Sequence, residues 1–222
     1  MEEPAGPIEI LHQDDACVVV NKPPGILVHR TRESTDQVFL LQTVRDQVGA
    51  RLNPVHRLDR PASGVLLFAT NGDYTRLFQE SMARPDADKR YLALVRGETS
   101  ASFTIDRELT NDGGKKQAAC TEFERVAEYD GFTLLRARLR TGRRHQIRRH
   151  LSGAAHQIVG DTAHGKGRIN AWLREEFGLT RLFLHAERLE CAHPSGGRLT
   201  VEAPLAPDLA SFLAKFSARP PA

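Results

Sequence analysis

Short apolar runs separated by polar turns make up most of the chain. The runs at residues 8–11 and 17–20 enclose the polar residues 13–15, a pattern that is typical of a β-hairpin. Residues 65–69 form a continuous apolar run, which predicts a buried strand. The other short apolar runs predict strands at residues 91–95, 182–184, 189–192 and 198–201.

Alternation of polar and apolar residues marks two further segments, residues 121–126 and 132–139. Because successive side chains of a strand point to opposite faces, both segments are predicted to be half-buried strands. In the second segment, Arg136 and Arg138 share their parity with Phe132, and Arg140 follows at the same spacing. The sequence therefore predicts three arginines on one face of one strand.

Apolar residues at helical spacing predict helices over residues 38–48, 73–82 and 208–216, and Asn71 or Asp73 would cap the second of them. A shorter helix is predicted over residues 143–151. Its Ile147 and Leu151 are four residues apart and are expected to face the core.

Two polar or proline-rich segments interrupt this pattern. Residues 21–25, with the sequence NKPPG, predict a rigid turn, because Pro fixes φ and Gly permits an unusual one. The polar residues 110–119 predict a mobile loop. Since predicted strands outnumber helices and hairpins recur, the pattern favours an α+β fold around a largely antiparallel sheet.

The net charge of +3, from 31 Lys and Arg against 28 Asp and Glu, is concentrated in one segment. Residues 131–160 contain seven arginines and no acidic residue, whereas the rest of the chain has 24 basic and 28 acidic residues, a net charge of −4. Clustered Arg is typical of phosphate-binding proteins, because guanidinium groups pair bidentately with phosphate oxygens. A codon bias would also explain 25 Arg against 6 Lys, so charge alone leaves polyanion binding open.

Cysteine and histidine spacing gives no sign of a metal site. Cys17, Cys120 and Cys191 lie at least seventy residues apart, and no H-E-x-x-H occurs among the nine histidines. We therefore expect no metal and a reduced, cytoplasmic setting. No apolar run approaches the roughly 18 residues of a membrane-spanning helix, and the acidic start does not resemble a secretory signal, so we expect no membrane association.

The densest set of reactive side chains lies at residues 56–64, with the sequence HRLDRPASG. Asp59 stands between Arg57 and Arg60 in a Pro/Gly turn directly ahead of the predicted buried strand. Neighbouring guanidinium groups favour the ionised carboxylate, which serves as a nucleophile or base. From the residues alone, the commoner alternative stays open that Asp59 only bonds the amides of the turn.

Residues 56–64 resemble the H-R-L-D-x-x-T-S-G signature of the RluA-type pseudouridine synthases, enzymes that isomerise uridine in structured RNA. Other stretches resemble this family's motifs in the same order: NKPPG at 21–25, KRY at 89–91, TGRRHQIRRH at 141–150, GD at 160–161, LHA at 184–186 and HP at 193–194. The resemblance spans about residues 8–203. Ala62 departs from the usual threonine, but it is a turn position and casts little doubt on Asp59.

The resemblance implies the catalytic fold of this family, a mixed and largely antiparallel sheet without an S4-type RNA-binding domain. We expect a single catalytic domain over residues 1–222, with two subdomains about a central cleft and frayed ends at 1–7 and 217–222. The implied reaction breaks the glycosidic bond, turns uracil in place and rejoins the sugar at C5, without a cofactor. The expected partner is RNA, and the expected state is a monomer.

The resemblance also implies roles for single residues. Asp59 would be the essential carboxylate, which attacks the sugar, attacks the ring or removes a sugar proton, and Arg148 would pair with it. Tyr91 would stack on the displaced base. Arg57 would fill the space that a flipped base leaves, and Leu184 would form an apolar wall. Ordinary alternatives remain: a phosphate contact for Arg148, core packing for Tyr91 and Leu184, and plain exposure for Arg57.

The remaining roles concern support and RNA contact. His56 is expected to support the turn. The arginines between Arg136 and Arg149 would form one stripe that holds the RNA backbone, with Arg143, Arg144 and Arg149 as its main contacts.

Residues 28–30, 42–47 and 177–182 resemble the branch that acts on uridine 65 of tRNA. Synthases for ribosomal RNA or another tRNA uridine share the catalytic motifs and remain alternatives. A non-catalytic RNA-binding protein is a further alternative, which the intact Asp59, Tyr91 and Arg148 disfavour. An Asp-dependent hydrolase would need a second carboxylate beside Asp59, and none appears there in the sequence.

Overall fold

The computed structural model describes residues 6–30 and 34–217, which contain five helices and twelve strands. Residues 1–5 and 218–222, on which most of the expected frayed ends fall, lie outside the described residues. The chain divides into two compact units. Unit 1 comprises Met1–Asp88 and Ala186–Pro204, and unit 2 comprises Lys89–His185 and Leu205–Ala222.

The sheet of unit 1 begins with β1 (Ile10–Gln13), β2 (Cys17–Lys22) and β4 (Ser63–Ala69), which pair antiparallel in this order. The short β3 (Asn53–Pro54) also pairs with β4, and β11 (Leu184–Ala192) lies beside β4 and pairs antiparallel with β12 (Arg198–Glu202). All seven residues of β4 are buried, which confirms the strand predicted from its continuous apolar run. The hairpin predicted at the start of the chain is confirmed as β1 and β2.

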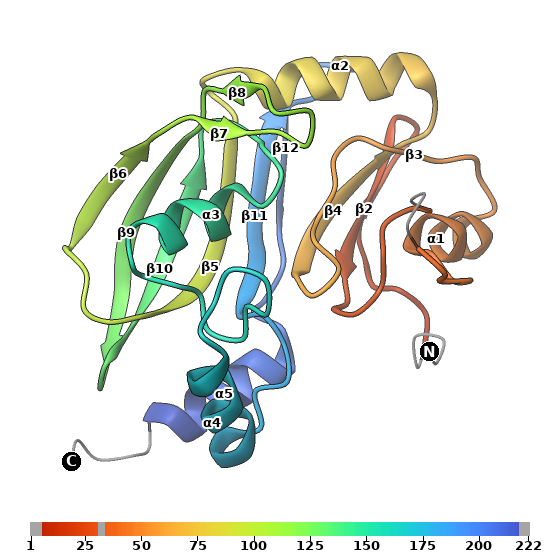
Figure 1. The fold of residues 1–222 in the computed structure, drawn as a ribbon. Helices are drawn as coiled ribbons and strands as arrows, with labels where there is room; N and C mark the ends of the chain where they lie inside the picture. Colours follow the sequence, from red (N-terminus) through yellow and green to blue (C-terminus); the bar gives the residue numbers. More distant parts are fainter. Residues whose placement is uncertain (1–5, 31–33, 218–222) are drawn as a thin grey trace. The chain divides into compact units, whose positions relative to one another are not determined.

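Two helices complete unit 1 (Figure 1). α1 (Leu40–Val48) buries Leu40 and Val44, as its spacing predicts. α2 (Gly72–Ala83) packs against β3 and β4 through Phe78, which is fully buried in the core of this unit. Asn71 caps α2, because its side-chain oxygen accepts a 2.9 Å bond from the Tyr74 amide.

The sheet of unit 2 has the antiparallel order β5 (Asp88–Arg96), β10 (Phe132–Leu139), β9 (Cys120–Tyr129) and β6 (Ser102–Asp106). α3 (Gln146–Gly153) packs on β9, and α4 (Gly167–Phe177) packs against α5 (Pro207–Ser217) (Figure 1). The Trp172 ring stacks on the Phe132 ring with centroids 6.4 Å apart, which joins α4 to the end of β10. The α+β, largely antiparallel fold expected from the sequence is confirmed.

Three predicted segments, a loop, a pair of strands and a helix, differ clearly from the structure. Within the expected loop at 110–119, β7 (Leu109–Thr110) and β8 (Lys116–Gln117) form a small hairpin, because the Asn111 side chain accepts bonds from the Gly113 and Lys115 amides and closes the turn. The strands expected at 182–184 and 189–192 are not separate, because β11 runs without a break from Leu184 to Ala192, and residues 182–183 precede it. Its polar Arg188 is accommodated by ion pairs with Glu190 and Glu202.

The helix expected over residues 143–151 begins later, at Gln146. His145 has the left-handed φ of 53°, which a helix cannot continue through, so the preceding residues form a turn. Ile147 and Leu151 are buried as predicted. The hydrophobic pattern does not predict α4 or β6, since α4 buries only Asn170 and Leu173, and β6 buries no residue completely. None of the described helices is long and apolar enough to cross a membrane.

Candidate active site

Asp59 lies half-buried in the turn that leads into β4. The Ala62 amide donates a 3.0 Å bond to the Asp59 carbonyl, so the turn closes over three residues. Leu58 is buried beside it, whereas Arg57 and Arg60 are exposed. The Arg60 guanidinium reaches back to the Gly25 carbonyl at 2.9 Å and to the Asp36 carboxylate at 3.2 Å. Asp59 therefore sits on a turn that is fixed on both sides.

Lys22 joins the NKPPG segment to this turn. Its side chain is fully buried, and its Nζ donates to the carbonyls of Pro23 at 2.8 Å, Ala62 at 2.8 Å and Arg60 at 3.2 Å. The Gly25 amide adds a 2.8 Å bond to the Arg60 carbonyl. Two segments that are over thirty residues apart thus form one structure that shapes the backbone around Asp59. The sequence marked Lys22 within a motif, but nothing in its spacing assigned it this supporting role.

Close backbone packing fixes the other end of the turn. Gly64 has a φ of 107°, and a Cβ atom there would lie 2.2 Å from the Ala186 carbonyl oxygen, so only glycine fits. His56 accepts a 3.1 Å bond at Nε2 from the Leu67 amide in β4. This contact agrees with the expectation that His56 supports the turn.

Arg148 is buried in α3 and forms a two-point ion pair with Asp161. Its Nε and Nη2 each donate to the Asp161 carboxylate at 2.8 Å, and Asp161 is 1 % exposed. The Asp161 carboxylate also accepts from the Ala163 and His164 amides. Burial opposes ionisation of Asp161, but the Arg148 bonds and these amides outweigh it and lower its pKa. The pair is therefore charged at neutral pH and holds the guanidinium in one orientation.

Other residues of the TGRRHQIRRH segment hold the start of α3 on the sheet. Gln146 accepts from the Thr141 hydroxyl and the Arg143 amide, and its Nε2 donates to the Cys120 carbonyl. His150 is fully buried, and its ring contacts Thr121 at 3.0 Å. Burial lowers the pKa of His150, so its imidazole is neutral at neutral pH. Gln146 and His150 of this motif therefore hold in place the helix that carries Arg148.

Tyr91 and Leu184 both belong to unit 2, Tyr91 on β5 and Leu184 as the first residue of β11. Tyr91 is half-buried on β5 opposite Ala137 of β10. Leu184 is 5 % exposed and begins β11, which agrees with either a wall of a site or ordinary core packing.

The three arginines expected to contact RNA lie around α3. Arg144 is exposed, and its Nη1 lies 2.6 Å from the Asp112 carboxylate. Arg143 is half-buried and donates to the Ala118 carbonyl at 2.9 Å, and Arg149 is half-buried on α3. Arg143 and Arg144 therefore contact the segment that contains the β7–β8 hairpin.

The expected single stripe of arginines from Arg136 to Arg149 is wrong. Arg138 lies opposite Arg90, and both point to the sheet face away from Tyr91, which lies opposite Ala137. His150 of α3 contacts Thr121 of β9. Thr121 lies on the same sheet face as Tyr91, because the residues that pair with them on β10, Leu139 and Ala137, are two positions apart. The arginines of β10 instead line a hollow of about 510 Å³ on the far face, together with residues that include Ser102, Thr104, Glu122 and Glu124.

The predicted site residues divide between the two units. Asp59 and Arg57 belong to unit 1, and the others belong to unit 2: Tyr91, Arg143, Arg144, Arg148, Arg149 and Leu184. Within unit 2, Asp161 is the residue that sequence reasoning left without a role. The sequence did contain a sign of this role, since Asp161 is the first acidic residue after the thirty-residue basic segment.

Comparison with known proteins identifies the same segments. The family model for RNA pseudouridylate synthase matches residues 16–153. A protein of Pectobacterium carotovorum named tRNA pseudouridine synthase C is 39% identical over 88% of this chain and 58% of its own length. The protein of the same name from Yersinia pestis is 37% identical over 88% of this chain and 86% of its own length.

A solved structure shares the fold. Human RNA pseudouridylate synthase domain containing 4 superposes with a TM-score of 0.78 at 24% identity, over 96% of this chain and 95% of the human one. The Lys22-supported turn around Asp59 and most of the Arg148 segment fall inside the matched residues 16–153. The chain therefore belongs to the family of RNA pseudouridylate synthases.

Proposed function

We propose that this protein isomerises uridine to pseudouridine in tRNA, at uridine 65, with Asp59 as the essential carboxylate. The observation that carries the proposal is the fixed turn around Asp59, built by Lys22 from the family's first motif. A carboxylate held on a rigid backbone can act at one atom of a bound nucleotide without reorganising. The relatives' shared name supports tRNA as the substrate class.

Uridine and pseudouridine are isomers, so the reaction neither adds nor removes atoms. The C1′–N1 bond breaks and a C1′–C5 bond forms, while C5 loses a proton and N1 gains one. Uracil must turn between the two bonds, so the enzyme has to hold the free ring. Tyr91, an aromatic residue on β5, is the residue proposed to stack on it. Leu184 is proposed as an apolar wall beside it.

Arg148 is proposed to keep the Asp59 carboxylate charged and oriented. A guanidinium has five N–H donors, so Arg148 can keep its two bonds to Asp161 and form a second ion pair at the same time. Asp161 would then act as a positioning residue that aims Arg148. Arg57, exposed beside Asp59, would occupy the stack that the flipped uridine leaves.

RNA backbone contacts are proposed for Arg143, Arg144 and Arg149. They lie in the same motif as Arg148, and phosphate contacts position a nucleic acid without reading its sequence. Cytoplasmic RNA is the proposed pool of substrate, and the acting species is proposed to be a monomer.

The test of the catalytic proposal is Asp59→Asn, which keeps the shape of the side chain and removes its charge. Purified wild type and variant are incubated with unmodified tRNA, and pseudouridine is mapped by position. We expect no product with the variant, and RNA affinity within about twofold of wild type, because charge rather than shape is lost. Turnover near wild type would refute the role of Asp59.

The target is tested separately by mapping pseudouridine in total RNA from cells that lack this protein. Loss at uridine 65 of tRNA alone supports the proposed target. Loss at a ribosomal position with tRNA unchanged would refute the tRNA target and leave the isomerase activity in place.

A further inference from the structure

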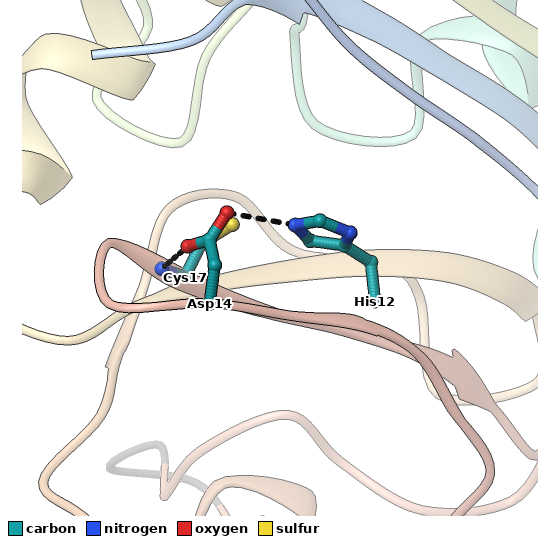
Figure 2. Close-up of side chains that lie close together, drawn as sticks. All are labelled: His12, Asp14 and Cys17. Atoms are coloured by element: carbon teal, nitrogen blue, oxygen red, sulfur yellow. Dashed lines mark hydrogen bonds and ion pairs between the residues drawn. The ribbon is translucent and has the colours of Figure 1, made fainter. Parts of the chain in front are cut away.

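The β1–β2 hairpin brings together three metal-ligating side chains that the proposed reaction does not use. They are His12, Asp14 and Cys17, and Figure 2 shows them at the turn of the hairpin. One ligand atom of each, a ring nitrogen, a carboxylate oxygen and the Sγ, lies within 4.8 Å of the other two. Ligands around a tetrahedral zinc ion lie about 3–4 Å apart, given bonds of 2.0–2.3 Å. Small side-chain adjustments would therefore bring all three onto one ion.

The turn itself orients the carboxylate. Asp14 Oδ1 accepts bonds from the amides of Ala16 at 2.8 Å and Cys17 at 2.9 Å, so Oδ2 is the oxygen that lies 2.8 Å from His12 Nε2 (Figure 2). The turn thus holds one carboxylate oxygen of Asp14 and leaves the other facing the His12 ring.

Cys17 supplies a sulfur from inside the protein. Its side chain is fully buried at the first position of β2. Binding of a cation would replace the S–H bond by a metal–sulfur bond and release one proton to solvent.

A neighbouring histidine lies on a second side of the carboxylate. His193 Nε2 lies 3.2 Å from Asp14 Oδ2, and its Nδ1 accepts a 3.2 Å bond from the Ser195 amide. His193 Nε2 is buried and forms no hydrogen bond in this arrangement, so it is a close neighbour of the carboxylate.

We propose that this hairpin binds one divalent transition-metal ion, zinc in the first place, through His12 Nε2, Asp14 Oδ2 and Cys17 Sγ. Imidazole, thiolate and carboxylate together suit zinc and disfavour magnesium and calcium, which prefer oxygen ligands alone. Carboxylate and thiolate balance the charge of the ion. The side chains of His12 and Asp14 are 37% and 32% exposed, so solvent reaches both, and water would supply a fourth ligand.

The ion would join the two strands of the hairpin at their turn and stabilise unit 1. This role is independent of RNA isomerisation, so the experiment measures metal binding and not enzymatic activity. The full chain is freed of metal with a chelator and titrated at about pH 8, where an ordinary histidine is neutral, with Co²⁺ and in parallel with Zn²⁺. Co²⁺ bound to a thiolate gives a charge-transfer band in the near ultraviolet, and calorimetry in two buffers gives the zinc stoichiometry and the protons released.

We expect one ion per chain, one proton released, and a thiolate band for wild type and for the control Cys120→Ser, whose cysteine lies in unit 2. In Cys17→Ser the band should disappear. In Cys17→Ser and in His12→Gln, zinc affinity should fall at least about 100-fold, because even outer-contact changes cost 10–100-fold. Both variants keep Asp14, so the bonds that close the turn remain.

Two outcomes would overturn the proposal. One is the absence of a thiolate band in wild type, which would leave the His12–Asp14 contact as a plain hydrogen bond. The other is a band that survives in Cys17→Ser, which would place the ion elsewhere.

Discussion

At the residue scale, buried polar side chains do much of the positioning in both units. Lys22 in unit 1 and Asp161 in unit 2 are at most 1 % exposed, yet each has several bonds to backbone atoms or to a charged partner. A buried polar group without partners costs free energy, so each residue is stable only in the arrangement that supplies them. The local backbone is thereby fixed in one conformation.

Replacing Lys22 by Met keeps the volume of the side chain and removes its bonds. The carbonyls of Pro23, Arg60 and Ala62 would each lose the Nζ donor. We therefore expect the free energy of unfolding to fall by about 3 kcal/mol. Urea denaturation measures this change. The exposed Lys115→Met is the matched control, with an expected change within about 0.5 kcal/mol. Equal stability of the two variants would contradict the supporting role of Lys22.

Asp161→Asn should destabilise the protein in a pH-dependent way. The pKa of Asp161 is lowered in the folded protein, because the bonds from Arg148 and two amides outweigh burial. Its contribution is therefore complete above the ordinary pKa of about 3.9 and is lost as the pH falls through that value and below. We expect the variant to be less stable by about 3–5 kcal/mol near neutral pH, because a buried guanidinium loses its partner, and by less near pH 3.

Denaturation at both pH values tests this, and Asp112→Asn is the control. Asp112 also faces an arginine, Arg144, but its side chain is 76% exposed, so the loss should stay below about 1 kcal/mol. A pH-independent loss in Asp161→Asn would indicate that packing rather than charge is responsible.

At the element scale, end signals decide where helices begin. α2 starts within one residue of its predicted start, because Asn71, one of the two predicted caps, caps it. α3 starts late because Gln146 bonds the residues ahead of it into a turn. A cap acts through one local bond and can be read from the sequence. The turn ahead of α3 depends on β9, through the bond from Gln146 to the Cys120 carbonyl.

The cap of α2 gives a local prediction. Asn71→Ala removes the acceptor for the Tyr74 amide and should cost about 1 kcal/mol of unfolding free energy. Asn71→Asp keeps an acceptor at the N-terminus of the helix and should be close to neutral. Thermal or urea unfolding separates the two variants, and an equal loss in both would show that the cap contributes nothing.

At the scale of the whole molecule, the arrangement of charge differs from its order in the sequence. The basic segment at 131–160 divides between two faces of the unit 2 sheet, and on the far face Arg140 pairs with Glu122 at 2.8 Å. Of the arginines in this segment, the three around α3 stay the proposed RNA contacts. The net charge of the segment thus overstates the basic surface on the Tyr91 face.

This division leads to a prediction about salt. RNA affinity should fall steeply with salt, and neutralising Arg143, Arg144 and Arg149 to Gln should reduce the log–log slope by about 2 to 3. Arg136→Gln with Arg138→Gln removes two charges from the other face and should leave the slope within about 0.5 of wild type. Binding titrations at several salt concentrations measure both. A larger effect of the second pair would place the RNA on the far face.

The sequence by itself determined the fold class, most strands and the family, and it limited the α2 cap to Asn71 or Asp73, because apolar periodicity, caps and contiguous motifs are local patterns. The roles of Asp59, Tyr91 and Arg148 stay predictions of the resemblance. The sequence also fixed the parity that puts Arg136 and Arg138 on one face, but not which face α3 covers.

Only the tertiary structure decided contacts between residues far apart in the chain. Lys22 reaches Ala62, and Arg148 reaches Asp161, through turns whose course spacing cannot specify. It also brought His12, Asp14 and Cys17 to one point, although no conventional ligand spacing joins them. The physical reason is the same in each case: a hydrogen bond or ion pair depends on distance in space, and the sequence records only distance along the chain.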